Sequence, residues 1–348
     1  MEQEFNHISK KKSFYEVEPH LIDYLKDFER YQFLPVSYDD LIRFEGSVHH
    51  YNEKGEHTLW QSVFYSPSVF DDIKRGLVQL YQMINGHEVQ YSHLTVGSID
   101  FCSFGNSKPF RIKIINEIND NHDYIYLKRS DSSRIYGLEL ESILSPNKIN
   151  FLTDGKTIVE EHISGLPADE FIVELQGVKG SEYDYVRITK EFVKFNERCF
   201  IRLLGDMRAY NFVVVITKDF DKNQYRFRAI DFDQQSFEGR KNIYLPQYFK
   251  DNYFFVEKAQ KYMSKETADQ YTKEEQGLVR KRILNETQRY RKLIDNLKMD
   301  RISTLDNINN LKNELHHYYK DDRFLKASSM GELVELNIKI RTNMGDIN

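Results

Sequence analysis

The sequence is poor in cysteine and has no long apolar run. Its 348 residues include only two cysteines, Cys102 and Cys199, which leaves neither a disulfide framework nor a cysteine-based zinc site. No stretch reaches the roughly 18 uninterrupted apolar residues that a membrane helix needs, and the start, MEQEFNHISKKK, contains no apolar signal-peptide core. These absences predict a protein of the reducing cytoplasm without a membrane span.

An excess of one charge sign is also lacking. The chain carries 49 basic and 54 acidic residues, so its formal net charge is only -5. A protein that binds nucleic acid usually shows a basic excess or a basic stripe, so no nucleic-acid partner is predicted. The short run Lys10–Lys12 is expected to be part of a solvated tail.

Several catalytic and metal-binding motifs are missing as well. The eleven histidines show no H-E-x-x-H or comparable ligand spacing, and the adjacent pairs His49-His50 and His316-His317 are more typical of exposed positions. No G-x-S-x-G motif or cysteine and histidine arrangement with supporting context occurs. Nucleophilic hydrolysis therefore has no support in the sequence.

What is present is typical of a globular enzyme core. The apolar fraction is 40%, with 24 Phe and 23 Tyr, and the length suggests about two domains. Near the start, two runs rich in aromatic and β-branched residues flank the turn-type cluster at 52–55, which predicts a hairpin over 41–65. A helix is predicted between Ser66 and Gly86. Residues 1–92 are interpreted as an N-terminal α/β module.

The next segment alternates in the manner of strands. Three strands are predicted between Ser98 and Lys128, followed by a helix over 132–144 and a second hairpin around Asp154-Gly155. This β-rich domain is placed at residues 93–165. Residues 166–348 are predicted to be mainly helical, with large-domain packing favoured over a coiled-coil partner surface for the last third.

The stretches LLGDMRAYNFVVV (203–215) and AIDFD (229–233) carry the chemistry. Asp206 and Asn211 stand five residues apart between a predicted helix and a predicted strand, and a hairpin returns the chain to Asp231. Phosphoryl transfer needs an acceptor for the proton of the incoming hydroxyl, and oxygen ligands that hold a metal ion against the phosphates. We therefore interpret Asp206 as the base, and Asn211 and Asp231 as metal ligands.

These two stretches resemble the catalytic loop and the metal-binding D-F-G of protein kinases. The resemblance, which covers residues 98–240, implies an α+β, protein-kinase-like two-lobe fold with a small antiparallel β lobe and a larger helical lobe. It also implies ATP and Mg²⁺ as cofactors, with Mn²⁺ as an alternative metal. Arg208 falls where the family holds a basic residue near the transferred phosphate. Asp233 would be a helper or a second metal contact, the alternative being a cap of the following turn.

The same resemblance implies a lysine and a glutamate in the small lobe. Lys128 ends the third predicted strand and matches the family lysine that contacts the phosphates, whereas Lys113 lies on the second strand. Its helical partner would be Glu139, because a helical wheel places this residue inside the apolar arc and Glu141 on the far side. The arc is defined by Ile135, Tyr136, Leu140, Ile143 and Leu144.

Two further segments would contact the nucleotide. The stretch TIVEEHISGLPADEF resembles the last small-lobe strand and the hinge, so backbone groups of Glu161, His162 and Ile163 would pair with adenine. A G-x-G-x-x-G loop is absent, and only Gly105, with Asn106 and Ser107, marks the turn that would cover the phosphates.

Other departures move the chain away from ordinary eukaryotic-type kinases. Leu204-Gly205 replaces the histidine and arginine before the catalytic aspartate, and no A-P-E segment follows. The Gly-Asp start resembles phosphoinositide kinases, and the second acidic residue of IDFD resembles aminoglycoside phosphotransferases, choline kinases and HipA-type bacterial kinases. The expected function is therefore an atypical kinase that transfers the γ-phosphoryl group to a hydroxyl.

The acceptor predicted first is a protein Ser or Thr, with a small-molecule hydroxyl as the alternative. Two further readings stay open. One is a pseudokinase that binds nucleotide as a scaffold, motivated by the missing glycine loop. The other is a kinase-fold enzyme that transfers AMP by binding ATP in reverse.

Overall fold

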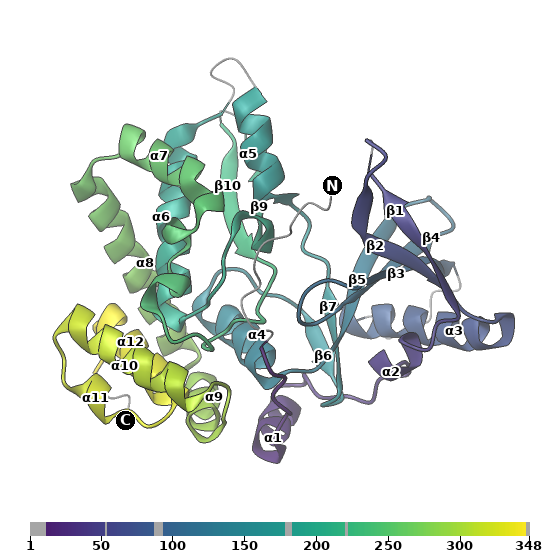
Figure 1. Cartoon of the computed structure of the whole chain (residues 1–348), viewed down its shortest axis with the longest axis horizontal. Coiled ribbons are helices and arrows are strands. Elements are labelled where there is room, and N and C mark those ends of the chain that lie inside the picture. Colours follow the sequence, from purple (N-terminus) through teal and green to yellow (C-terminus); the bar gives the residue numbers. More distant parts are fainter. Residues whose placement is uncertain (1–11, 53, 87–92, 178–182, 220–221, 346–348) are drawn as a thin grey trace. The chain divides into compact units, whose positions relative to one another are not determined.

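The structure, a computed structural model, describes residues 12–52, 54–86, 93–177, 183–219 and 222–345 (Figure 1). The chain forms two compact units. Unit 1 comprises Met1–Ser132 and Ile149–His162, and unit 2 comprises Ser133–Lys148 and Ile163–Asn348. The mixed α+β class predicted from the sequence is confirmed.

Unit 1 is built on a seven-stranded antiparallel sheet. In spatial order, its strands are β1 (Gly46–Tyr51), β2 (His57–Phe64), β3 (Leu94–Cys102), β4 (Phe110–Asn116), β5 (His122–Arg129), β7 (Thr157–Glu161) and β6 (Phe151–Thr153). Both predicted hairpins and the predicted three-stranded meander are present. Because β2 pairs with β3, the first hairpin belongs to the same sheet as the meander, and the division predicted at residue 92 falls inside unit 1.

One face of this sheet forms the core of unit 1. Along β4, the buried Phe110, Ile112 and Ile114 alternate with Arg111 and Lys113, as expected of a strand with one buried face. The buried face packs against α3 (Pro67–Ile84), which lies across the strands in Figure 1, and shorter helices α1 (Pro19–Asp27) and α2 (Tyr38–Leu41) precede the sheet. The alternation therefore turns the other residues of the strands to the opposite face.

The opposite face carries a row of polar residues in register. Asp100 on β3 lies opposite Arg111 on β4, Arg111 lies opposite Tyr126 on β5, and Tyr126 lies opposite Glu160 on β7. Arg111 Nη2 donates a hydrogen bond of 2.9 Å to Asp100 Oδ2. Lys128 lies two residues beyond Tyr126 and shares this face.

Unit 2 is mainly helical. Its helices are α4 (Ser132–Leu144, apart from its first residue), α5 (Ala168–Gly177), α6 (Tyr185–Arg202), α7 (Tyr253–Tyr262), α8 (Lys265–Asn285), α9 (Thr287–Met299), α10 (Leu305–Tyr319), α11 (Arg323–Lys326) and α12 (Met330–Thr342). Short 3₁₀ turns are η1 (Ala209–Asn211), η2 (Lys241–Tyr244), η3 (Pro246–Tyr248) and η4 (Lys250–Asn252). The predicted helical character of the last third is confirmed.

Helix α6 is central to unit 2. Asp184 caps its first turn by accepting a hydrogen bond of 3.1 Å from the Arg187 N–H, and Leu203 ends it in the left-handed conformation. Helices α7 and α8 lie alongside it (Figure 1). The predicted hairpin after α6 is formed by β9 (Phe212–Thr217) and β10 (Gln224–Ala229), and β8 (Leu166–Pro167) pairs with β9.

Two sequence interpretations need correction. Lys12, the described part of the basic run, is buried and forms an ion pair of 3.1 Å with buried Asp131, so it does not belong to a solvated tail. Helix α4 is buried along its whole length rather than on one arc, and Glu141, expected on the far side, is only 2% exposed. The helical wheel assumed one solvent-facing side, which this helix does not have.

No helix within the described residues is both long and apolar enough to cross a membrane.

Candidate active site

The turn that presents Asp206 follows directly from the end of α6. The Gly205 N–H donates to the Gln234 carbonyl at 3.2 Å, and the Asp206 N–H donates to the Ile243 carbonyl at 3.2 Å. A Cβ at position 205 would lie only 3.0 Å from the Gln234 carbonyl oxygen, so this close approach of two chain segments favours glycine. Asp206 itself has a φ of 57°, a conformation that aspartate adopts more readily than most residues.

Asn211 joins this turn to the second acidic stretch. Its Nδ2 donates to the Asp206 carbonyl at 2.7 Å, and its own carbonyl accepts a hydrogen bond of 3.0 Å from the Ile230 N–H. The register of the β9–β10 hairpin explains this contact, because Phe212 lies opposite Ala229. The residues just before β9 and just after β10 are therefore neighbours, as the predicted hairpin requires.

Asp231 and Asp233 share one cation. Arg134 Nη1 lies 3.1 Å from Asp231 Oδ1 and 2.7 Å from Asp233 Oδ1. Asp231 Oδ1 also accepts a hydrogen bond of 3.0 Å from the Asp233 N–H. The Arg134 side chain is 1% exposed, that of Asp233 12% and that of Asp231 34%, so Asp231 is the carboxylate within reach of solvent.

Helix α4 holds Arg134 in place through its first two turns. Ser133 Oγ donates to the Gln235 carbonyl at 2.6 Å. At Gly137, a Cβ would approach Phe232 Cβ to 2.9 Å, so the helix contacts residues 231–233, here called the acidic turn, more closely than a larger residue would permit. The acidic turn and the start of α4 therefore form one packed assembly.

Asp206 has a different partner from the other two aspartates. Arg208 Nε lies 2.9 Å from Asp206 Oδ1, and Arg208 Nη1 lies 3.6 Å from Asp251 Oδ2. Burial raises the pKa of the Asp206 carboxyl, against the opposing effect of Arg208. A raised pKa suits a carboxylate that accepts a proton near neutral pH.

The segment after the acidic turn is anchored beside the Asp206 turn. The Ser236 N–H donates to the Leu203 carbonyl at 2.8 Å, and Asn252 Nδ2 donates to the Met207 carbonyl at 2.8 Å. Asn307 of α10 contributes another bond of 2.8 Å, from its Nδ2 to the Phe237 carbonyl. The segment 236–252 is therefore hydrogen-bonded to the backbone on both sides of Asp206, at Leu203 and at Met207.

Lys128 and Glu139 each have a strong partner within their own unit. Lys128 Nζ lies 3.0 Å from Glu160 Oε2, and both side chains are less than a tenth exposed. Glu139 Oε2 lies 2.8 Å from Arg289 Nη2 of α9. The Lys128–Glu139 pair stays a prediction, because the two residues belong to different units.

The other residues predicted to contact the nucleotide lie in the turn between β3 and β4 and at or just after the end of β7. Gly105, with a φ of 85°, lies with Asn106 and Ser107 in the turn between β3 and β4. Glu161 ends β7, and its N–H donates to the Asn150 carbonyl at 3.0 Å. Ile163 is the first residue of unit 2 after this strand and is buried. Their contact with adenine stays a prediction.

Sequence reasoning missed Arg134 and Glu160. On the wheel used for the helix, Arg134 lies close to Glu141, on the side assumed to face solvent. Its one signal was indirect: an arginine in the first turn of a helix whose other residues are largely apolar or small. Glu160 had no separate signal, because its pairing depends on β7 lying next to β5.

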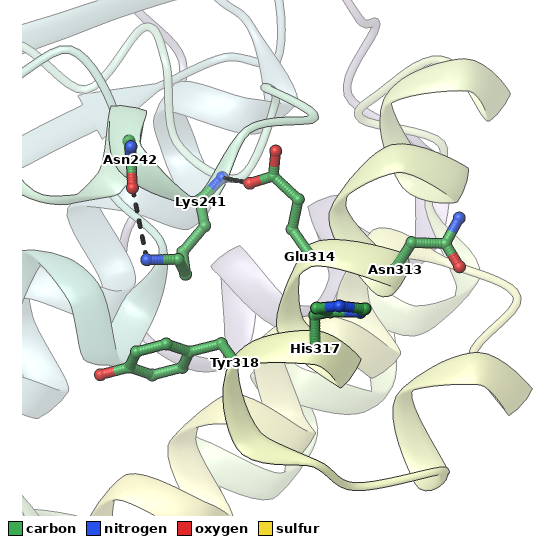
Figure 2. Close-up of a pocket in the computed structure, with 6 residues that line it drawn as sticks. All are labelled: Lys241, Asn242, Asn313, Glu314, His317 and Tyr318. Atoms are coloured by element: carbon green, nitrogen blue, oxygen red, sulfur yellow. Dashed lines mark hydrogen bonds between the residues drawn. The ribbon is translucent and has the colours of Figure 1, made fainter.

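A separate groove of about 620 Å³ lies between η2 and α10 (Figure 2). Its lining residues are Lys241, Asn242, Asn313, Glu314, His317 and Tyr318. Lys241 contacts two other residues of the groove. Its N–H donates to Glu314 Oε2 at 2.6 Å, and its Nζ lies 4.5 Å from the Tyr318 ring centroid. None of the predicted site residues lines this groove.

Within the described ranges, no three His, Cys, Asp or Glu side chains gather in an arrangement that would hold a metal ion. The predicted ligands, Asn211, Asp231 and Asp233, would not form such a group, because one of the three is an amide. No family model matches this chain, and no curated protein matches its sequence at a significant level.

Proposed function

We propose that this protein is an ATP- and Mg²⁺-dependent phosphotransferase that transfers the γ-phosphoryl group to a hydroxyl. The observation that carries the proposal is the hydrogen-bonded connection of three residues from two chain segments. Asn211 bonds the backbone of Asp206 at 2.7 Å and that of Ile230, next to Asp231, at 3.0 Å. Asn211 thus links the candidate base Asp206 to the segment that carries Asp231. It bonds the first with its side-chain amide and the second with its backbone carbonyl.

Asn211 and Asp231 fit a divalent cation. Because Asn211 Nδ2 donates to the Asp206 carbonyl, the amide is oriented, and its Oδ1 is the atom suited to a metal. Asp231, one-third exposed, offers a carboxylate that a hydrated ion can reach. Asn211 and Asp231 would hold the ion, which when bound would neutralise the charge of the ATP phosphates.

Asp206 would accept the proton of the attacking hydroxyl. The pair with Arg208 fixes the carboxylate, while burial raises its pKa toward the range in which a base works well. Arg208 would also lie near the transferred phosphoryl group. Both roles follow the resemblance of this loop to protein kinases.

The topology of unit 1 supports a kinase-like small lobe. Along the chain, the strands β3, β4 and β5 are followed by α4 and then by β6 and β7, which is the succession of elements that the resemblance implies. Lys128 lies at the end of the third of these strands, where the resemblance places the lysine that contacts the phosphates. A protein Ser or Thr is the acceptor proposed first.

The test is incubation of the purified full chain with Mg²⁺ and either γ-labelled or α-labelled ATP, with a mixture of protein acceptors. We expect transfer of label from the γ position, and a decrease of about 10²- to 10⁴-fold in Asp206→Asn, as for loss of a general base. Asp231→Ala should also lose transfer. Asp269→Ala, which changes an exposed aspartate of α8, is the matched control and should keep it.

Each alternative gives a different result. Label from the α position would replace phosphoryl transfer by AMP transfer. Label on a small alcohol but on no protein would favour a small-molecule kinase. Absence of label together with a melting temperature that Mg²⁺ and ATP do not change would rule out the enzymatic proposal, whereas a raised melting temperature without label would favour a nucleotide-binding scaffold.

A further inference from the structure

The guanidinium of Arg134 occupies a place between the two carboxylates of the acidic turn. A single nitrogen, Nη1, donates to Asp231 Oδ1 at 3.1 Å and to Asp233 Oδ1 at 2.7 Å. Two carboxylates this close repel each other strongly unless a cation lies between them. Arginine supplies that cation permanently, because its guanidinium stays protonated at any physiological pH.

The position of this cation is fixed by several contacts. Arg134 Nη2 lies 3.4 Å from the Ile230 carbonyl oxygen, and the neighbouring Ser133 bonds the Gln235 carbonyl. The close approach of Gly137 to Phe232 holds the helix against the same turn. These contacts hold the start of α4 and the Arg134 side chain against the turn.

The charge that remains suits one divalent ion. Asp231 and Asp233 together contribute two negative charges, and Arg134 offsets one of them. Protein kinases, by comparison, hold two magnesium ions at the equivalent aspartate and asparagine. A site with one residual negative charge and a neutral amide has less attraction for a second ion.

We infer that Arg134 takes the place of a second metal ion, so that this enzyme works with a single divalent cation. The inference rests on the proposed function. Asp231 and Asn211 are then the metal ligands, and Asp233, whose side chain is 12% exposed, is the anchor that holds Arg134. Arg134 is a positioning residue for the metal site rather than a group that contacts the reacting atoms.

The test counts bound metal ions without measuring turnover. The full chain is titrated with Mn²⁺ in the presence of a saturating non-hydrolysable ATP analogue, and free Mn²⁺ is followed by electron paramagnetic resonance. A matched titration of the analogue without protein gives the Mn²⁺ bound by free nucleotide, which is subtracted. We expect one bound Mn²⁺ per wild-type chain. Arg134→Lys, which keeps the charge, should also bind one, whereas Arg134→Gln should bind a second. A purely structural role for Arg134 would not produce this difference between the two variants.

Asp233→Asn provides a second comparison. If Asp233 anchors Arg134 and does not bind the metal, this variant still binds one Mn²⁺; complete loss of Mn²⁺ binding in a folded Asp233→Asn chain would overturn the assignment. Two ions on the wild type, or one on a folded Arg134→Gln chain, would overturn the inference while leaving the proposed function standing. No nucleotide-dependent Mn²⁺ on the wild type would remove both.

Circular dichroism checks that each variant is folded. If Arg134→Gln fails to fold, the wild-type count decides alone: one ion supports the inference and two ions overturn it.

Discussion

Two arginines hold the aspartates of the candidate site in opposite ways. Arg208 is two residues from Asp206 in the chain, and both side chains of this pair are about one-third exposed, at 33% and 34%. Arg134 reaches Asp231 and Asp233 from a helix roughly a hundred residues earlier, and its side chain is 1% exposed. Arg208 is a local and partly exposed partner, whereas Arg134 is a long-range and buried one, although Asp231 and Asp206 are equally exposed, at 34% each.

The difference bears on what each arginine contributes to stability. A partly exposed ion pair, such as Arg208 with Asp206, contributes little. A buried pair is costly to break, because removal of one partner leaves an uncompensated charge. Removal of the Arg134 guanidinium should therefore cost more stability than removal of the Arg208 guanidinium.

The largest effect is expected for Arg134→Leu. The substitution leaves two adjacent carboxylates without their shared cation, and loss of one partner of a buried pair typically costs about 3–5 kcal/mol of unfolding free energy. Urea denaturation of the full chain, followed by circular dichroism, measures this cost. Arg134→Lys is the matched control and should lose less. A cost below that of Arg208→Gln would show that the contrast between the two arginines is wrong.

A smaller effect is expected where α4 contacts the acidic turn. In Gly137→Ala, the added Cβ would meet Phe232 at 2.9 Å, and overpacking of this kind costs about 1–3 kcal/mol. The matched control is Gly277→Ala in α8, where nothing lies within 4 Å of the added Cβ. This control should gain up to about 1 kcal/mol from its higher helix propensity. Equal responses of the two variants to urea would contradict the close packing of α4.

The local parts of this arrangement were predictable from the sequence. Three strands were predicted between Ser98 and Lys128, and a helix and a strand were predicted on either side of Asp206 and Asn211; β3, β4, β5, α6 and β9 lie at these places. The hairpin predicted between Asn211 and Asp231 is also present, and its antiparallel register brings the two ends of the hairpin together.

The long-range partners were not predictable. Arg134 pairs with residues 97 and 99 positions away, and no periodicity relates them. Lys128 pairs with Glu160 because β7 lies beside β5, although β6 precedes β7 in the chain. The wheel for α4 failed for a related reason, since a helix buried on every side has no single apolar arc.

Arg208→Gln should cost little stability. The pair with Asp206 is partly exposed, and exposed pairs contribute about 0–1 kcal/mol. The same variant should lower phosphoryl transfer, because the proposed function places Arg208 near the transferred group. The two measurements, urea denaturation and γ-label transfer, thus separate stability from activity. A cost comparable to that of Arg134→Leu would mean that Arg208 is as structural as its buried counterpart.

The subtlest consequence of the comparison is in the pH dependence of stability. Burial raises the pKa of Asp206 above its ordinary value of 3.8, so the folded chain binds this proton more tightly than the unfolded chain. The contribution of Asp206 to stability is therefore fully present below pH 3.8 and is lost as the pH rises through the raised pKa.

The variant Asp206→Asn lacks this titration. The unfolding free energy of the wild type minus that of the variant, measured in urea from about pH 3 to pH 7, should decrease with pH and then level off. Other carboxylates are common to both proteins and cancel in this difference. A difference that increases with pH would mean that Arg208 outweighs burial, and Asp206 would then be held as firmly ionised as a structural ion pair requires.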